Sequence, residues 1–487
     1  MNDKKYSISK SSFLKLEQCS KSFFLYKNHP YLRDKLSIDK RLTFQRGHDI
    51  GYFAQQLFPE GIDVSKETNN AGEAYELTKK LLQDKKPVIY EATFIHEGVL
   101  VMLDILVFDG EKYHAYEVKS SIKVSETYLR DACLQYYVLK NSLPSFEDLF
   151  LVTINGEYVF EKEIEPKKYF KKRSVKNEAE KNLVYFEEKI KEAYFILEQN
   201  LIPNIAIGKH CFRPYQCDFF QTCWKGRLHE KSIFNLPLIS KDKLFEWHEQ
   251  GFAAIDELKD DLFENEKHLR IKKSFAGQEP IINIENIKKL LSGIELPAAA
   301  LDMEIWSSAV PQLEGTRPFQ QIPFLFCMTD GLKENHFISR HATDERKRFA
   351  EELIQQTSPY KTIIVYDKTM EELAINGLKE NCPELSGELD ILKTKLKDLF
   401  DIIKNLYFYD PAFKNNFSLK VVSDVLNTGV TYTDIQSGLE AMNYYEKYRS
   451  ESNVIEDKLL EEKLINYCMN DASATLKLWQ YLENLIK

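Results

Sequence analysis

Residues 100–121 read LVMLDILVFDGEKYHAYEVKSS, two apolar stretches interrupted by Asp104, Glu117 and Lys119. The stretches predict two β-strands, and the Asp-Gly pair at 109–110 is a strong signal for a two-residue hairpin loop. With that loop, the two carboxylates become diagonal neighbours on one face, about 7–8 Å apart at Cα. Strand interiors disfavour Asp, Glu and Lys, so this face needs an explanation.

Two interpretations of the hairpin remain open. Carboxylates that converge from adjacent strands suit a hard divalent cation such as Mg²⁺ or Mn²⁺. A nearby lysine then stabilises negative charge on a reacting phosphate. The alternative is an edge hairpin with a solvated charged face, which is the commoner case for an arbitrary hairpin.

The order D-x12-E-V-K, followed by a predicted helix that carries Gln135, resembles the core of the PD-(D/E)xK nucleases, specifically their RecB-like branch. This resemblance implies that Asp104, Glu117 and the backbone carbonyl of Val118 hold the metal ion. It also implies that Lys119 assists the attacking water.

Three further positions are compared with the RecB-like pattern. Glu91, in the strand IYEATF, fits an additional upstream acidic position. The stretch RGHDIG resembles the helix that delivers a histidine to the metal, but the usual spacing G-x-x-x-H places Gly51 where histidine is expected. His48, three residues earlier, is therefore the candidate. The signature Q-x-x-x-Y is also imperfect because position 139 is Leu, and Gln135 is expected to position the substrate.

Cys211, Cys217 and Cys223 follow a C-x5-C-x5-C spacing that fits a loop wrapped around a metal, and Cys19 is the natural fourth ligand. The phrase LKLEQCSKSFFLYK resembles the N-terminal cysteine helix of RecB-like nucleases of the AddB and CRISPR-associated exonuclease types. That resemblance implies a [4Fe–4S] cluster, whereas the spacing alone leaves zinc open. The other four cysteines are interpreted as packing residues.

A second acidic set lies toward the C-terminus. In AAALDMEIWSS, period-two spacing places Asp302 and Glu304 on one face of a strand. Tyr467 and Asp471 are four residues apart and share one side of a helix. Between them, TIIVYDKTMEEL predicts a buried strand that runs into a helix, with Glu371 near the helix start.

This order resembles the DnaQ-like exonucleases of the DEDDy type, which have an RNase H-like fold. The resemblance implies two metal ions held by Asp302, Glu304, Glu371 and Asp471, with Tyr467 orienting the water. The usual middle motif, H-N-x-x-F-D, is here Y-D-K-T-M-E, so Glu replaces Asp and either Asp398 or Asp401 is an alternative ligand.

The predicted fold class is α/β. We expect a restriction-endonuclease-like PD-(D/E)xK domain with the four-cysteine site over residues 1–228, a helical connector over 229–295, and an RNase H-like, DnaQ-type domain over 296–487. The whole chain resembles a bacterial family labelled only as a domain of unknown function. The phrases EVKSS, LQYYVL and YCMNDASAT carry this resemblance.

The predicted function is that of a metal-dependent DNA nuclease, an exonuclease that acts on single-stranded or end-bearing DNA. A nucleic-acid-binding scaffold with an inactive nuclease domain and an RNA-processing exonuclease are the alternatives. The chain has 487 residues, 43% of them hydrophobic, and a net charge of −9, which argues against attraction of nucleic acid by the whole molecule but leaves open a local basic channel around an acidic metal site. Residues 166–176, PKKYFKKRSVK, are either a phosphate-contacting patch or a solvated helix face. With no apolar run of 18 residues and no signal peptide, we expect a cytoplasmic protein without a membrane partner.

Overall fold

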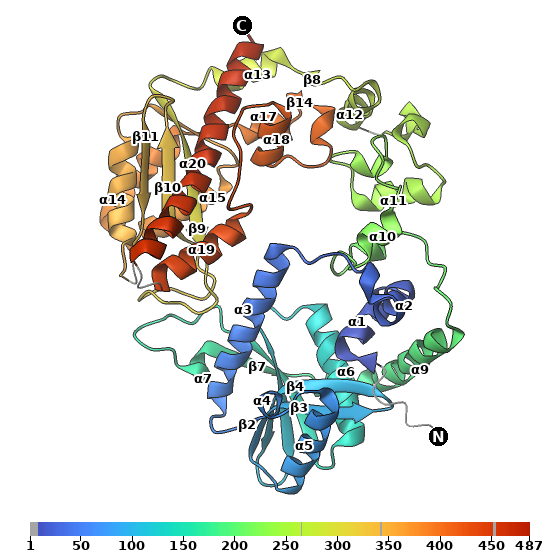
Figure 1. The fold of residues 1–487 in the computed structure, drawn as a ribbon. Coiled ribbons are helices and arrows are strands. Elements are labelled where there is room, and N and C mark those ends of the chain that lie inside the picture. Colours follow the sequence, from blue (N-terminus) through green and yellow to red (C-terminus); the bar gives the residue numbers. More distant parts are fainter. Residues whose placement is uncertain (1–7, 264, 341–342, 451–453) are drawn as a thin grey trace. The chain divides into compact units, whose positions relative to one another are not determined.

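The computed structural model describes residues 8–263, 265–340, 343–450 and 454–487. The chain divides into two compact units (Figure 1), of which the first is Met1–Lys225 with Ala309–Phe319 and the second is Gly226–Ser308 with Gln320–Lys487. Both units combine helices with a β-sheet, which confirms the predicted α/β class. In the described residues, no helix has the length and apolar character needed to cross a membrane.

The described part of the first unit is built around a seven-stranded sheet of order β2-β3-β4-β5-β6-β7, with β1 paired to β4. Strands β3, β4 and β5 are antiparallel, and β5 and β6 are parallel because helix α6 connects them. The strands are β1 Ile8–Ser9, β2 Ile62–Asp63, β3 Val88–His96, β4 Val99–Phe108, β5 Tyr113–Lys119, β6 Phe146–Ile154 and β7 Phe170–Ser174. The helices are α1 Lys10–Gln18, α2 Ser20–Asn28, α3 Ile38–Ala54, α4 Val64–Glu67, α5 Ala71–Gln83, α6 Glu126–Ser142, α7 Pro166–Tyr169, α8 Lys176–Lys181, α9 Leu183–Gln199 and α10 Phe220–Trp224.

Alternation of side chains along the strands builds a hydrophobic core on each face of this sheet. On one face, Ala115 and Leu151 pack with residues of α1, α5, α6 and α9. On the other, Tyr116 and Val152 pack with Ile50 of α3. Residues next to each other in the sequence thus enter different cores, as expected for strands covered on both faces.

The hairpin of residues 100–121 forms, but its register differs from the prediction. The central residues of the turn are Gly110 and Glu111, because Asp109 pairs with Lys112 and its side chain accepts hydrogen bonds from the two backbone N–H groups that follow Gly110. Gly110 takes a φ of +108°, which suits glycine at the first central position. The register therefore shifts by two residues, and the strand pairing ends at Ile105 and Tyr116. Continued by one position, this register brings Glu117 across from Asp104 rather than diagonal to it.

Strand β4 is irregular at this same place. Leu103 and Leu106 belong to the same core, so regular alternation is interrupted between them, where Asp104 lies. Across the ladder, Glu91 takes a φ of +54°, a conformation that non-glycine residues rarely adopt. The acidic pair therefore sits at a local distortion of the sheet.

The second unit contains a five-stranded sheet of order β11-β10-β9-β12-β13 in its described residues. Strands β9, β10 and β11 are antiparallel, whereas β9, β12 and β13 are parallel. The strands are β8 Ile281–Ile282, β9 Ala298–Trp306, β10 Ile322–Thr329, β11 Glu334–Ile338, β12 Thr362–Val365, β13 Leu396–Asp398 and β14 Phe408–Tyr409. The helices are α11 Lys241–Glu249, α12 Glu266–Gly277, α13 Ile284–Leu291, α14 Arg346–Thr357, α15 Thr369–Asn381, α16 Ser386–Lys395, α17 Phe400–Lys404, α18 Leu419–Val425, α19 Gly438–Ser450 and α20 Val454–Leu485.

The compact units divide two segments of the chain differently from the predicted domain boundaries. The expected connector, residues 229–295, is part of the second unit, and its Trp247 and Phe275 share a core with Ala300 of β9 and Leu478 of α20. Residues 309–319, expected in the C-terminal domain, belong to the first unit. In this loop, the backbone N–H of Gly315 donates to the carbonyl of Phe160.

We expect Leu103→Ala to lower the free energy of unfolding of the first unit by about 2–5 kcal/mol, because it leaves a cavity in a close-packed core. Leu103 is fully buried, whereas the neighbouring Met102 is 40% exposed. Urea denaturation followed by circular dichroism measures the effect, with Met102→Ala as the control, which we expect to change stability by less than about 1 kcal/mol. Equal losses of unfolding free energy in both variants would contradict the assignment of Leu103 to the core and of Met102 to the exposed face.

Candidate functional site

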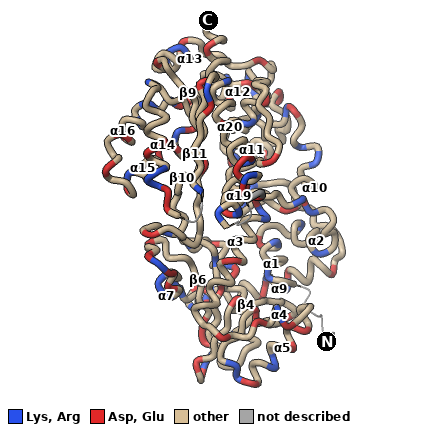
Figure 2. The backbone as a smooth tube through the Cα atoms, turned by 60° about the vertical axis from the view of Figure 1, so that its left-hand side comes forward, with Lys and Arg blue, Asp and Glu red and all other residues tan. Residues whose placement is uncertain are grey.

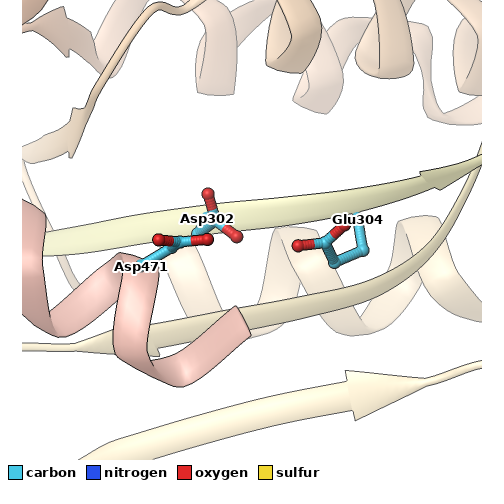
Figure 3. Close-up of side chains that lie close together, drawn as sticks. All are labelled: Asp302, Glu304 and Asp471. Carbon is cyan, nitrogen blue, oxygen red and sulfur yellow. The ribbon is translucent and has the colours of Figure 1, made fainter. Parts of the chain in front are cut away.

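Three carboxylates of the second unit converge between strand β9 and helix α20. Asp302 and Glu304 follow Ala298 and Ala300 along β9 with period two, so they continue the face of the strand that helix α20 covers. Asp471 projects from α20 toward them (Figure 3). One carboxylate oxygen from each residue lies within 4.8 Å of the others. Among the described residues, this is the only group of three or more Asp, Glu, His or Cys ligands that meets this distance.

The surroundings of this triad favour the protonated, uncharged form of its three carboxyl groups. Burial, followed by the charge of Asp471, raises the pKa of Asp302 well above its usual value. Burial also raises the pKa of Glu304 well above its usual value, with Asp302 and Asp471 adding to the effect. Burial raises the pKa of Asp471 as well. Buried like charges that raise one another's pKa are stabilised by a divalent cation, which replaces the protons.

Tyr467 lies beside the triad, in contact with two residues that the sequence analysis did not identify. Lys420 of α18 donates a hydrogen bond to the Tyr467 hydroxyl (3.0 Å), and its ammonium lies 4.4 Å from the centre of the Tyr467 ring. The hydroxyl of Tyr432 donates to a carboxylate oxygen of Asp471. No spacing in the sequence relates Lys420 or Tyr432 to the acidic motifs, so only the fold brings them together.

Glu371 lies near the start of α15 and is 4% exposed. Its pKa is raised well above the usual value by burial and then by the charge of Asp302. Its Oε2 atom has no hydrogen-bond partner among the described residues, and neither has Oδ2 of Asp302. The alternative ligand Asp398 instead accepts hydrogen bonds from the backbone N–H groups of Asp367, Lys368 and Phe400, which ties its carboxylate to a turn.

The acidic pair of the first unit lies on strands β4 and β5, with Glu117 buried and Asp104 half-buried. The backbone N–H of Val118 donates to Oδ2 of Asp104 at 2.6 Å. Burial, followed by the charge of Glu117, raises the pKa of Asp104 to about 8. Burial and the charges of Asp63 and Glu117 raise the pKa of Glu91 to about 7. Three of the predicted residues therefore influence one another electrostatically.

Two lysines hold Glu117 in its ionised form. Lys119 and Lys10 both donate to Oε1 of Glu117, at 2.7 and 2.8 Å, and Lys119 also donates to Asp131 at 2.6 Å. Burial alone would raise the pKa of Glu117, but the two ammonium groups outweigh it and lower the pKa to about 2. The other oxygen, Oε2, is buried and has no hydrogen-bond partner among the described residues. It is therefore the oxygen of Glu117 that neither lysine contacts by a hydrogen bond.

Lys10 and Asp131 were not identified from the sequence, although one signal was present. Asp131 precedes Gln135 by four residues, so both occupy the same side of α6. Gln135 is fully buried, and neither atom of its amide group has a hydrogen-bond partner among the described residues. Lys10 offers no such signal, since it lies far from the hairpin in the sequence.

The structure does not connect His48 to this site. His48 is exposed on α3, and it forms no hydrogen bond or ion pair with another described residue. Its role as a metal ligand stays a prediction from the resemblance, which was already weakened by the shifted spacing.

The four predicted cysteines come together. Cys19, Cys211, Cys217 and Cys223 all line one pocket, although Cys19 lies almost two hundred residues before the other three. All four are free thiols. Cys19 occupies the junction between α1 and α2, and Cys223 lies on α10. The pocket therefore joins the N-terminal helices to the segment that follows the sheet.

Residues 166–176 form a short helix and the edge strand β7 rather than one helix. Basic and acidic residues are interspersed around α7 (Figure 2). Several of the cations are paired: Lys168 with Glu165, Lys171 with Glu157, Arg173 with Glu178 and Lys176 with Glu147. Charged residues on an edge strand prevent pairing with other chains, so a structural role is sufficient for this segment.

Residues 299–418 match a family model described as a domain of unknown function (DUF2779). No curated protein matches the chain. Among solved structures, a family B DNA polymerase from the hyperthermophilic archaeon Pyrobaculum calidifontis matches with 15% sequence identity and a TM-score of 0.23. The match covers 38% of this chain and 24% of the polymerase, and similarity this low carries no information on function.

We expect Mn²⁺ to stabilise the second unit through Asp471. At a hundredfold excess over its dissociation constant, a bound ion contributes about 2.7 kcal/mol. Asp471→Asn removes that gain and, by relieving repulsion between buried carboxylates, does not destabilise the metal-free protein. Thermal denaturation with and without Mn²⁺ measures both effects. The chain used also carries Asp104→Asn, so that binding of Mn²⁺ by the first unit does not contribute to the response.

Asp434→Asn is the matched control, because this exposed carboxylate of the same unit pairs with Lys463. It should keep the full response to Mn²⁺. No response in the parent chain, or an equal response after Asp471→Asn, would show that the triad does not bind the ion.

Proposed function

We propose that this protein is a metal-dependent nuclease with two active sites, one in each unit. The observation that carries the proposal is the triad of half-buried Asp302 with buried Glu304 and Asp471, whose carboxylate oxygens approach within 4.8 Å. Burying three carboxylates together is costly unless protons or a metal ion neutralise them. A structural role would not require that cost, whereas metal-dependent phosphodiester hydrolysis uses such carboxylates to hold divalent cations beside the scissile phosphate.

In the second unit, the triad together with Glu371 supplies the ligands for Mg²⁺ or Mn²⁺. The metal ions would activate water and stabilise charge on the phosphate. Tyr467 is placed to orient the attacking water, because its hydroxyl is fixed by Lys420. Tyr432 holds Asp471 through its hydroxyl, which limits the rotation of that carboxylate. In line with the DnaQ-like resemblance, we assign this site the removal of nucleotides from a strand end.

In the first unit, Asp104, Glu117 and the carbonyl of Val118 are the proposed metal ligands. Lys119 is held by Glu117 and Asp131 and provides the positive charge beside the reacting phosphate. For Gln135 we propose the role of positioning the substrate, supported by an amide that has no partner among the described residues. Asp104 and Glu117 come from adjacent strands, and the backbone N–H of Val118 donates to Asp104 at 2.6 Å, which supports a shared site. DNA is the proposed substrate.

Asp104→Asn and Asp302→Asn, each made singly, should each remove one of two cleavage activities. Because each change removes a metal ligand, we expect the affected rate to fall on the order of 100-fold or more. Cleavage of end-labelled single-stranded DNA, duplex DNA with ends and RNA of the same sequence, with Mn²⁺, measures both activities. The double variant should cleave none of them.

Glu111→Gln and Asp434→Asn are the controls, since both residues are exposed and lie outside the proposed sites. They should retain full activity. Cleavage that survives in the double variant would refute the two-site proposal. Binding of DNA without cleavage by the parent chain would instead favour a scaffold, and cleavage of RNA alone would make the protein an RNA-processing enzyme.

We also propose that the four cysteines bind a [4Fe–4S] cluster rather than zinc. Four thiolates bound to one zinc ion at about 2.3 Å would lie within about 4 Å of one another. Among the described residues, only the acidic triad brings three or more such ligand atoms within 4.8 Å of one another, so no three of the pocket's four sulfurs meet that distance. A cluster accepts wider spacing because each thiolate binds a different iron atom.

Protein purified without oxygen should contain about four iron atoms per chain and a visible absorption band that bleaches on reduction. Cys19→Ala and Cys217→Ala should lose the iron. Cys133→Ala is the control, because this buried cysteine of the same unit does not line the pocket. One zinc ion per chain and no iron would contradict the proposed iron–sulfur cluster but support a metal site at the four cysteines. The absence of both metals would contradict a metal site there.

A further inference from the structure

Lys10 is a second cation of the first acidic site, contributed by an element far from the hairpin in sequence. Its ammonium lies 2.8 Å from Oε1 of Glu117 and 3.6 Å from Asp131. Lys119 contacts the same two carboxylates at 2.7 and 2.6 Å. The four side chains therefore form a group in which two half-buried ammonium groups balance two buried carboxylates. Two ammonium groups on one oxygen of Glu117 hold that carboxylate in place and leave Oε2 without a partner among the described residues.

Lys10 is the first residue of α1, and the start of this helix is anchored to the sheet. The preceding residues Ile8 and Ser9 form strand β1, which pairs with β4, the strand that carries Asp104. Ser9 caps the helix by accepting a hydrogen bond from the backbone N–H of Ser12. The backbone at Lys10 therefore has little freedom to move relative to β4.

The end of α1 is anchored to the cysteine segment. Gln18 donates to the backbone carbonyls of His210 and Tyr215, at 2.8 and 2.7 Å. Lys15 pairs with Asp218 at 2.9 Å, and the next residue after the helix is Cys19. A nine-residue helix is about 13 Å long, so α1 spans the distance between the two sites.

The body of α1 is packed firmly enough to move as one piece. Phe13 is fully buried and contacts Phe186 of α9 with ring centres 5.9 Å apart. Glu17 pairs with Arg130 of α6, the residue next to Asp131. A displacement of the cysteine segment would therefore reach the acidic group through the helix and not be absorbed within it.

We propose that Lys10 is a positioning residue of the first nuclease site, which holds Glu117 ready for the metal ion, and that α1 makes this placement depend on the cysteine segment. The inference rests on the proposed nuclease function of the first unit. It adds to that function a residue outside the D-x12-E-V-K motif and a physical connection between the two sites of the unit.

The test uses the full chain with Asp302→Asn and Asp471→Asn, so that only the first site acts. Lys10→Met should slow cleavage of DNA at least tenfold, because Glu117 is less constrained. Titration calorimetry should show that Mn²⁺ binds this variant at least as tightly as the parent, because one nearby positive charge has been removed. Lys10→Arg should restore the rate to within threefold, and Lys112→Met, an exposed control, should change neither quantity.

Gln18→Ala tests the connection without altering a cysteine. It should slow cleavage at least threefold in the parent chain and have no further effect in the Lys10→Met background, because both changes act through the same contact. If Lys10→Met does not fold, Lys10→Gln replaces it with the same expectations.

Three outcomes would overturn the inference. The first is an unchanged rate in Lys10→Met while Asp104→Asn is inactive, which leaves the nuclease function intact. The second is a parallel loss of Mn²⁺ affinity, rate and melting temperature, the mark of a purely structural role. The third is full additivity of Gln18→Ala with Lys10→Met. If Asp104→Asn cleaves as fast as the parent, the proposed function itself is wrong and the inference falls with it.

Discussion

Carboxylates buried beside one another are the constraint on which both units depend. Removing such groups from water costs several kcal/mol each unless an opposite charge, a proton or a metal ion accompanies them. The sheets supply the rigidity that holds them in place: Asp104 and Glu117 face each other on paired strands, and Asp302 and Glu304 share one strand. Without strong packing around them, mutual repulsion would separate these side chains.

The two units meet this constraint in different ways. In the first, the ammonium groups of Lys10 and Lys119 balance the charges of Glu117 and Asp131 within the protein. In the second, Lys420 acts on the whole triad, and the pKa of every member stays raised. The lysines thus compensate only part of the first site, because the pKa values of Asp104 and Glu91 are raised as well, to about 8 and about 7.

Local patterns predicted much of this arrangement. Period-two spacing placed Asp302 and Glu304 together on β9, and helical spacing placed Asp471 on α20 beside Tyr467. The regular cysteine spacing identified residues that do line one pocket. The hairpin register was wrong because the side chain of Asp109 organises the turn, which moves the central positions by one residue. A single Asx interaction thus decides whether the two acids are opposite or diagonal.

The residues that the sequence did not reveal are joined to the sites over long distances along the chain. Lys10 and Glu117 are 107 residues apart, and Lys420 and Tyr467 are 47 apart. A lysine at the start of a helix carries no local signal, because surface lysines at such positions are common. What distinguishes Lys10 is that β1 pairs with β4 and fixes the helix start over the hairpin, and strand pairing of this kind depends on the whole sheet. The spacing of residues within a motif therefore identifies ligands on one element or on adjacent elements. The lysines that compensate the charge of these ligands are distant in the sequence, and only the tertiary fold brings them close.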